Sequence, residues 1–137
     1  NIKEIELLNK NYLSSCKSYA EQSDLIRFFI IRQFGGVYID TDFECLKNIS
    51  PLLENVRCFL TKEKRIDGEN ITNAIFGATI KNDFIKYVCE ILPDRLEKTK
   101  KWSKYESCNR IGPYFLEKIY QEYMNNLEVT VFPCEYF

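Results

Sequence analysis

The sequence predicts an α/β fold with an antiparallel or mixed sheet. Helix-like and strand-like apolar patterns alternate along the chain, and the strongest helical pattern gives way, across two glycines, to a short strand-like run. The chain has 137 residues, 45% of them hydrophobic, which is enough for one core. We therefore expect a single domain over residues 1–137.

The first third of the chain is expected to be helical in two parts. A helical lead-in is indicated by four apolar residues, Ile5, Leu7, Leu8 and Tyr12. A stronger helix is expected over Tyr19–Phe34, where apolar side chains recur on one face. Gly35-Gly36 then provides a stop, because glycine adopts the positive φ of a helix end at little cost.

Four strands and two further helices are expected downstream. The strands are predicted at residues 37–39, 57–61, 71–80 and 129–132, the first of them buried and central in the sheet. A turn and helix start is expected at residues 48–51, and a polar loop at Asp67-Gly68. One helix is predicted over residues 83–92, closed by Pro93, and another from Gly112-Pro113 to Tyr123.

The charge of the chain argues against a nucleic-acid partner, and its hydropathy argues against a membrane-spanning segment. Nineteen basic and 20 acidic residues give a net charge of −1, which does not match the basic surfaces that bind nucleic acid. The most apolar stretch, residues 25–34, contains Arg27 and Arg32 and is far shorter than the roughly 20 residues that a membrane span needs. We expect no membrane span here and a cytoplasmic location, with a membrane-peripheral one as the alternative.

The six cysteines are expected to be reduced and buried. They are scattered singly, and the chain has no histidine to complete a zinc site. Several lie inside apolar patterns, where a thiol packs as a small hydrophobic side chain. The sequence therefore predicts no disulfide.

The chemical focus is Asp40-Thr41-Asp42, which follows the strand predicted at residues 37–39. On a continued strand, residues i and i+2 point to the same face, so both carboxylates could serve one ligand set. Mn²⁺ and Mg²⁺ prefer oxygen ligands and bind well when a substrate diphosphate completes the shell. We expect Asp40 and Asp42 to hold such a metal. Alone, the tripeptide is weak evidence, since paired acids are common in surface turns.

Two segments strengthen this interpretation by resemblance to a known family. They are residues 23–27, SDLIR, and residues 34–42, FGGVYIDTD. Their residue types and spacing resemble the sugar-binding-region glycosyltransferases with an Asp-X-Asp motif. That family includes capsular-polysaccharide transferases and yeast-type initiating mannosyltransferases, with clostridial glucosylating toxins as distant relatives. Looser similarity extends over residues 46–53, 72–78, 112–114 and 133–137.

The resemblance implies a fold, a reaction and a set of site residues. The fold would be the nucleotide-sugar transferase type A, Rossmann-like with a mixed sheet. The reaction would be metal-dependent transfer of a hexose from a nucleoside diphosphate sugar to a saccharide or other acceptor, with retention of configuration. By this resemblance Asp42 binds the metal, Asp40 contacts the metal shell or the donor, Asp24 and Arg27 hold the sugar, Tyr38 lies beside the donor, and Asn73 faces the reacting centre.

The chain departs from the family pattern at both ends. The resembled enzymes begin with an additional strand-helix-strand segment and continue to a histidine and a tryptophan near the metal. We therefore expect this sequence to be a fragment that lacks both ends. Two other interpretations stay open: a phosphatase of the haloacid-dehalogenase type, with Asp40 as nucleophile and Asp42 as acid, and a non-catalytic remnant that binds sugar nucleotides.

Overall fold

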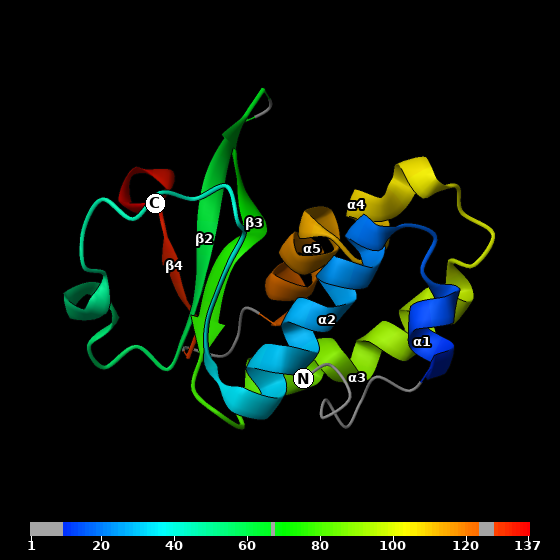
Figure 1. Ribbon diagram of the computed structural model, residues 1–137, viewed down its shortest axis with the longest axis horizontal. Helices are drawn as coiled ribbons and strands as arrows, with labels where there is room; N and C mark the ends of the chain where they lie inside the picture. The colour runs from blue at the N-terminus through cyan, green and yellow to red at the C-terminus, as the bar shows by residue number, and fades with distance from the viewer. Residues whose placement is uncertain (1–9, 67, 124–127) are drawn as a thin grey trace.

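The computed structural model describes residues 10–66, 68–123 and 128–137, which form a sheet with helices packed on one of its faces (Figure 1). The main core lies between these two layers and includes Leu25, Phe28, Leu60 and Phe76. The chain is thus α/β with a mixed sheet, as the sequence predicts.

Two helices open the described chain, α1 (Lys10–Ser15) and α2 (Tyr19–Phe34). The predicted lead-in helix is confirmed only at Tyr12, since Ile5, Leu7 and Leu8 lie outside the described residues. The bounds of α2 match the prediction. Ser18 caps it by accepting a hydrogen bond from the Glu21 N–H, and Gly35 ends it with φ at 65°. A side chain at Gly35 would also clash with the Ile80 backbone nitrogen, 2.8 Å from the position of a Cβ atom.

The sheet has four strands in the order β1-β3-β2-β4: β1 (Gly36–Ile39), β2 (Cys58–Arg65), β3 (Gly68–Ala78) and β4 (Thr130–Phe132). β3 pairs antiparallel with both β1 and β2, whereas β4 runs parallel to β2. β2 and β3 are longer than predicted, because their polar ends pair with each other up to Arg65 and Gly68. The hairpin therefore projects past the helices (Figure 1).

The prediction that residues 37–39 form a buried central strand is wrong in its placement. β1 lies at one edge of the sheet and pairs only with β3 among the described residues. Its side chains alternate: Tyr38 packs against Phe76, while Val37 and Ile39 are 38% and 44% exposed. A run of three apolar residues does not distinguish a two-sided strand from one that is buried on a single face.

The prediction that Pro93 closes a helix is also wrong. α3 (Asp83–Lys98) starts at the cap residue Asn82 and continues through Pro93 for five more residues. The proline removes one hydrogen bond, but Leu92 and Leu96 are fully buried one turn apart on the same face. Packing of this face against the core offsets the missing bond.

The remaining helical segments are short. The predicted turn after residue 48 is a 3-10 helix, η2 (Ser50–Leu53), and it lies across the sheet from α2 (Figure 1). The lysine-rich segment after α3 contains η3 (Lys104–Glu106) and α4 (Ser107–Arg110). α5 (Pro113–Tyr123) starts and ends as predicted, and η4 (Cys134–Tyr136) follows β4.

All six cysteines are free thiols, so the predicted absence of disulfides is confirmed. Their predicted burial holds for Cys58 and Cys89, where burial raises the thiol pKa to about 12. It is wrong for Cys45 and Cys108, which are exposed: Cys45 lies in the irregular segment after β1 and Cys108 on the short helix α4, and neither packs into the core. Among the described residues, no helix combines the length and apolar character needed to cross a membrane.

Candidate functional site

Asp24 and Arg27 lie one turn apart on the face of α2 that meets the sheet. The Arg27 guanidinium is buried, with its Nη2 atom 3.3 Å from Asp24 Oδ1 and its Nη1 atom 3.4 Å from Asp40 Oδ1. It also donates to the hydroxyl and the carbonyl oxygen of Ser23, at 3.2 and 3.4 Å. Arg27 is therefore not an exposed helix cation; it joins the two acids from the interior.

An irregularity in β3 brings Asn73 to this pair. The β2–β3 register shifts between Phe59 and Thr61, so that residues 73–76 of β3 face the single residue Leu60. Such a bulge frees backbone groups from the ladder. The carbonyl oxygen of Asn73 accepts from Arg27 Nη1 at 2.7 Å, and the Asn73 side-chain amide donates to Asp24 Oδ1 at 2.8 Å.

Tyr38 and Asp40 complete the group from the end of β1. The Tyr38 hydroxyl donates to Asp40 Oδ1 at 2.6 Å, and the Arg27 guanidinium carbon lies 4.4 Å from the centre of the Tyr38 ring. The Asp40 N–H donates to the Ala74 carbonyl oxygen at 2.8 Å, so pairing with β3 continues one residue past the end of β1. The structure thus brings together Asp24, Arg27, Tyr38, Asp40 and Asn73, which we call the buried cluster.

Asp42 stands apart from the buried cluster. The strand ends at Ile39, and a turn closed by a 3.3 Å bond from the Phe43 N–H to the Asp40 carbonyl contains Asp42. The expectation that Asp40 and Asp42 share a strand face is therefore wrong, because aspartate and threonine favour turns once strand pairing stops. Asp42 is exposed, whereas Asp40 is half-buried.

Burial dominates the electrostatics of the cluster. It raises the pKa of Asp24 to about 6, even though the Arg27 charge and the Asn73 hydrogen bond act in the opposite direction. The negative charges of Asp40 and Glu21 add to the increase. The pKa of Tyr38 is also raised, first by burial and then by its hydrogen bond to Asp40.

Gly112 lies close to the Asp24 carboxylate. A Cβ atom at Gly112 would lie 3.3 Å from Asp24 Oδ2 and 2.9 Å from the Cys108 Cα atom. Gly112 is also the residue whose carbonyl oxygen accepts the Leu116 N–H at the start of α5. The sequence predicts a helix start at Gly112-Pro113, and Gly112 also borders the site.

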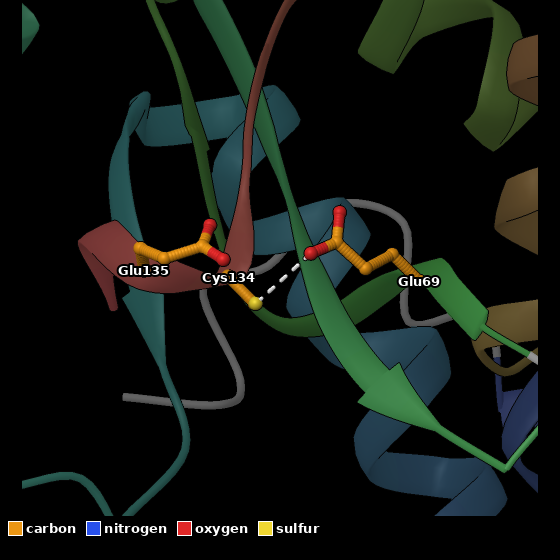
Figure 2. A group of neighbouring side chains, drawn as sticks. All are labelled: Glu69, Cys134 and Glu135. Carbon is orange, nitrogen blue, oxygen red and sulfur yellow. Dashed lines mark hydrogen bonds between the residues drawn. The ribbon is translucent and has the colours of Figure 1, made fainter.

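The two acids of the motif suit a hard cation only as part of a larger ligand set. Asp40 and Asp42 supply carboxylate oxygens, the ligand type that Mg²⁺ and Mn²⁺ prefer. They do not belong to any group of three converging ligand side chains among the described residues. The one such group found there is Glu69, Cys134 and Glu135, on β3 and η4 (Figure 2). It is largely exposed, and its Cys134 thiol is hydrogen-bonded to Glu69 at 3.2 Å.

Comparison with known proteins identifies sequence similarity over the part of the chain that contains most of the site. The model of a family described as the glycosyltransferase sugar-binding region containing DXD motif matches residues 1–59. The resemblance predicted from the sequence is confirmed. The matched region contains Asp24, Arg27, Tyr38, Asp40 and Asp42, while Asn73 lies outside it.

Several curated proteins similar to this chain are named for mannosyl transfer. The chain is 29% identical to mannosyl phosphorylinositol ceramide synthase CSH1 of Saccharomyces cerevisiae, over 82% of the chain and 29% of that protein. It is 30% identical to synthase SUR1 of the same yeast, over 75% of the chain and 26% of that protein. It is 33% identical to inositol phosphoceramide mannosyltransferase 1 of Schizosaccharomyces pombe, over 59% of the chain and 26% of that protein. The chain thus spans less than a third of the length of each.

Proposed function

We propose that this chain is the donor-sugar-binding part of a glycosyltransferase that moves a hexose from a nucleoside diphosphate sugar to an acceptor hydroxyl. The observation that supports it most is the buried cluster, in which an arginine holds two carboxylates beside the end of β1. The family match over residues 1–59 supports the same reaction class. Mannose is the first donor sugar to test, because these relatives are named for mannosyl transfer.

In this proposal Asp24 binds the sugar and Arg27 organises the site. The Arg27 guanidinium already contacts Asp24, Asp40, Ser23 and the Asn73 carbonyl, so its main role is to hold both carboxylates in place. Asp24 Oδ1 receives the Asn73 amide, while Oδ2 lies under Gly112. An ionised Asp24 can accept hydrogen bonds from adjacent sugar hydroxyls through Oδ2.

Asn73 acts in this proposal by positioning. Its side-chain amide and its backbone carbonyl are both committed, to Asp24 and to Arg27 respectively. We expect it to fix the orientation of the Asp24 carboxylate and the rotamer of Arg27. The family resemblance implies that Asn73 faces the reacting centre. That role stays a prediction, because the reacting centre forms only when the donor is bound.

Asp40 and Asp42 would hold a divalent cation together with the donor diphosphate. The metal would stabilise the negative charge on the departing diphosphate. Asp42 is exposed in its turn and so is accessible to a ligand, while the Tyr38 hydroxyl together with Arg27 keeps Asp40 Oδ1 fixed at the inner end of the turn. We also propose that the transfer retains the anomeric configuration of the sugar and that the metal is Mn²⁺ or Mg²⁺.

The acceptor is proposed more broadly, as a saccharide or another hydroxyl-bearing headgroup. The yeast relatives are named for inositol phosphoceramide, a lipid with a polar inositol phosphate head. For this protein, that headgroup and a free oligosaccharide are the two acceptors to compare.

A donor panel tests the proposed function. The purified protein is incubated with Mn²⁺ and a set of nucleoside diphosphate hexoses, and release of nucleoside diphosphate is followed with and without the two acceptors. We expect release with one or a few donors, abolished in Asp42→Asn. Phosphate release from simple phosphomonoesters, with no turnover of any sugar nucleotide, would support the phosphatase alternative and contradict the proposal.

A further inference from the structure

A second ion pair on α2 is more deeply buried than the one at Arg27. Glu21 and Arg110 are both fully inaccessible, and Arg110 Nη1 donates to Glu21 Oε2. Arg110 also donates to the Thr99 hydroxyl at 2.9 Å and to the carbonyl oxygens of Ser15 and Leu96 at 3.1 and 3.2 Å. The pair therefore connects the ends of α1 and α3 to α2 and α4.

The same network reaches Gly112 through Ser107. The Ser107 hydroxyl donates to Glu21 Oε1 at 3.0 Å. The Ser107 carbonyl oxygen accepts the N–H groups of Ile111 and Gly112, at 3.1 and 3.2 Å. Two atoms of one serine thus join Glu21 to the residue that lies over Asp24.

The network and the candidate sugar site share one helix face. Glu21 and Asp24 are three residues apart on α2, so they are neighbours on the helix surface. A Cβ atom placed on Gly112, at the turn between α4 and α5, would lie 3.3 Å from Asp24 Oδ2, so this turn borders the Asp24 carboxylate. A shift of that turn would change the space over Oδ2 directly.

Stability alone is a weak reason for such a pair. Removing two charges from water is costly, and well-packed apolar residues of similar volume often stabilise a fold equally well. What apolar side chains cannot reproduce is the fixed direction of the hydrogen bonds that Arg110 and Glu21 make. The arrangement is thus better suited to orientation than to stability.

We propose that Glu21 and Arg110 are positioning residues for sugar recognition: through Ser107 they fix the turn at Gly112 over the Asp24 carboxylate. This inference rests on the proposed function, because it assigns Asp24 to the donor sugar. Neither residue touches the donor. Their effect is on the sugar part of the donor and not on its nucleotide part.

The test compares two ligands on the same protein. Dissociation constants in Mn²⁺ are measured by calorimetry for the nucleoside diphosphate sugar that the wild type binds best and for the nucleoside diphosphate alone. Glu21→Leu/Arg110→Met removes both charges together, so neither is left buried without a partner. We expect a folded protein whose affinity for the sugar nucleotide is about tenfold weaker, with unchanged affinity for the diphosphate.

A milder variant and a control accompany the double replacement. Ser107→Ala removes the hydroxyl between Glu21 and α4, and we expect a loss of about threefold with the same ligand selectivity, which decides the matter if the double variant does not fold. Asp94→Asn/Lys98→Gln removes an exposed ion pair on α3 and should change neither constant.

The outcomes separate the two proposals. A wild-type protein that binds no sugar nucleotide contradicts the proposed function itself. If the wild type binds and a folded Glu21 or Ser107 variant keeps its sugar selectivity, or loses both ligands equally, the positioning role is overturned while the proposed function stands.

Discussion

The two ends of the candidate site differ in how much of their structure exists before a ligand arrives. At the α2 end, Asp24 and Arg27 are held by Asn73 and Ser23 in the interior. At the other end, Asp42 lies in an exposed turn with no third ligand side chain converging on it among the described residues. We infer that the sugar end is preorganised, whereas the metal end is completed by the donor diphosphate.

The largest effect is expected at the centre of the preorganised end. Arg27→Met leaves Asp24 and the Asn73 carbonyl in the interior without their cation, which should cost about 3–5 kcal/mol in the free energy of unfolding. Urea denaturation measures it. The matched control is Arg57→Met, which breaks the exposed pair with Glu128 and should cost about 1 kcal/mol or less. Equal losses in the two variants would show that the cluster is not preorganised.

Arg27→Lys tests whether the guanidinium geometry is needed, because lysine keeps the positive charge but lacks the planar set of N–H donors. One ammonium cannot reach Asp24, Asp40 and the Asn73 carbonyl together in the geometry that Arg27 uses. We expect donor affinity to fall by about tenfold, while the dependence of binding on Mn²⁺ is retained. Donor kinetics identical to wild type would exclude the organising role of Arg27.

Fold stability and donor binding should depend on pH with opposite signs. Asp24 has a pKa of about 6 in the fold, above the ordinary aspartate value of 3.8, so the folded state binds the proton more tightly. Its contribution to stability is therefore fully present below about pH 4 and is lost as pH rises through 6, by about 2–3 kcal/mol. Donor binding, which needs the carboxylate, should instead strengthen over this range.

Asp24→Asn isolates this contribution. The difference in unfolding free energy between wild type and variant, measured from pH 4 to pH 7.5, should change with pH in the direction just given. Other carboxyl groups titrate in both proteins and cancel in the difference. A difference that is constant with pH would show that Asp24 binds no more protons in the fold than in the unfolded chain, so that its pKa is not raised.

Gly112→Ala is expected to have an intermediate effect. The added methyl group meets the Cys108 backbone and Asp24 Oδ2, at 2.9 and 3.3 Å, so the turn has to move. We expect a loss of about 1–3 kcal/mol in stability together with weaker binding of the sugar nucleotide. Asn109→Ala, at an exposed position nearby, is the control and should leave both close to wild type.

Sequence reasoning predicted the local part of this arrangement well. The α2 helix has the predicted bounds because its cap, its apolar stripe and its terminal glycine are all contained within about 18 residues. Asp40 was predicted from the strand that precedes it, and Asp24 and Arg27 from the resemblance of two short segments to a known family. These features depend on neighbours in sequence, which local patterns describe directly.

The features that were missed depend on distant residues. The edge position of β1 is set by the pairing order of the whole sheet, and α3 passes Pro93 because of core packing. The bulge that delivers Asn73 results from a register shift against β2. Arg110 gives no signal in the sequence, since its partner Glu21 lies 89 residues away.

The smallest effect on stability is expected at the exposed end. Asp42→Asn alters a solvated side chain in a turn, so the free energy of unfolding should stay within about 0.5 kcal/mol of wild type. Thermal or urea unfolding checks this. A larger loss would show that Asp42 has a structural role that its exposure does not reveal.

Donor titration with and without Mn²⁺, in Asp24→Asn and in Asp42→Asn, tests the division between the two ends most directly. We predict that Asp24→Asn binds the sugar nucleotide weakly but still about tenfold or more tightly with Mn²⁺ than without it, because its metal end is intact. Asp42→Asn should lose the response to Mn²⁺ and keep its preference for the sugar nucleotide over the diphosphate. The same Mn²⁺ response in both variants would contradict the account.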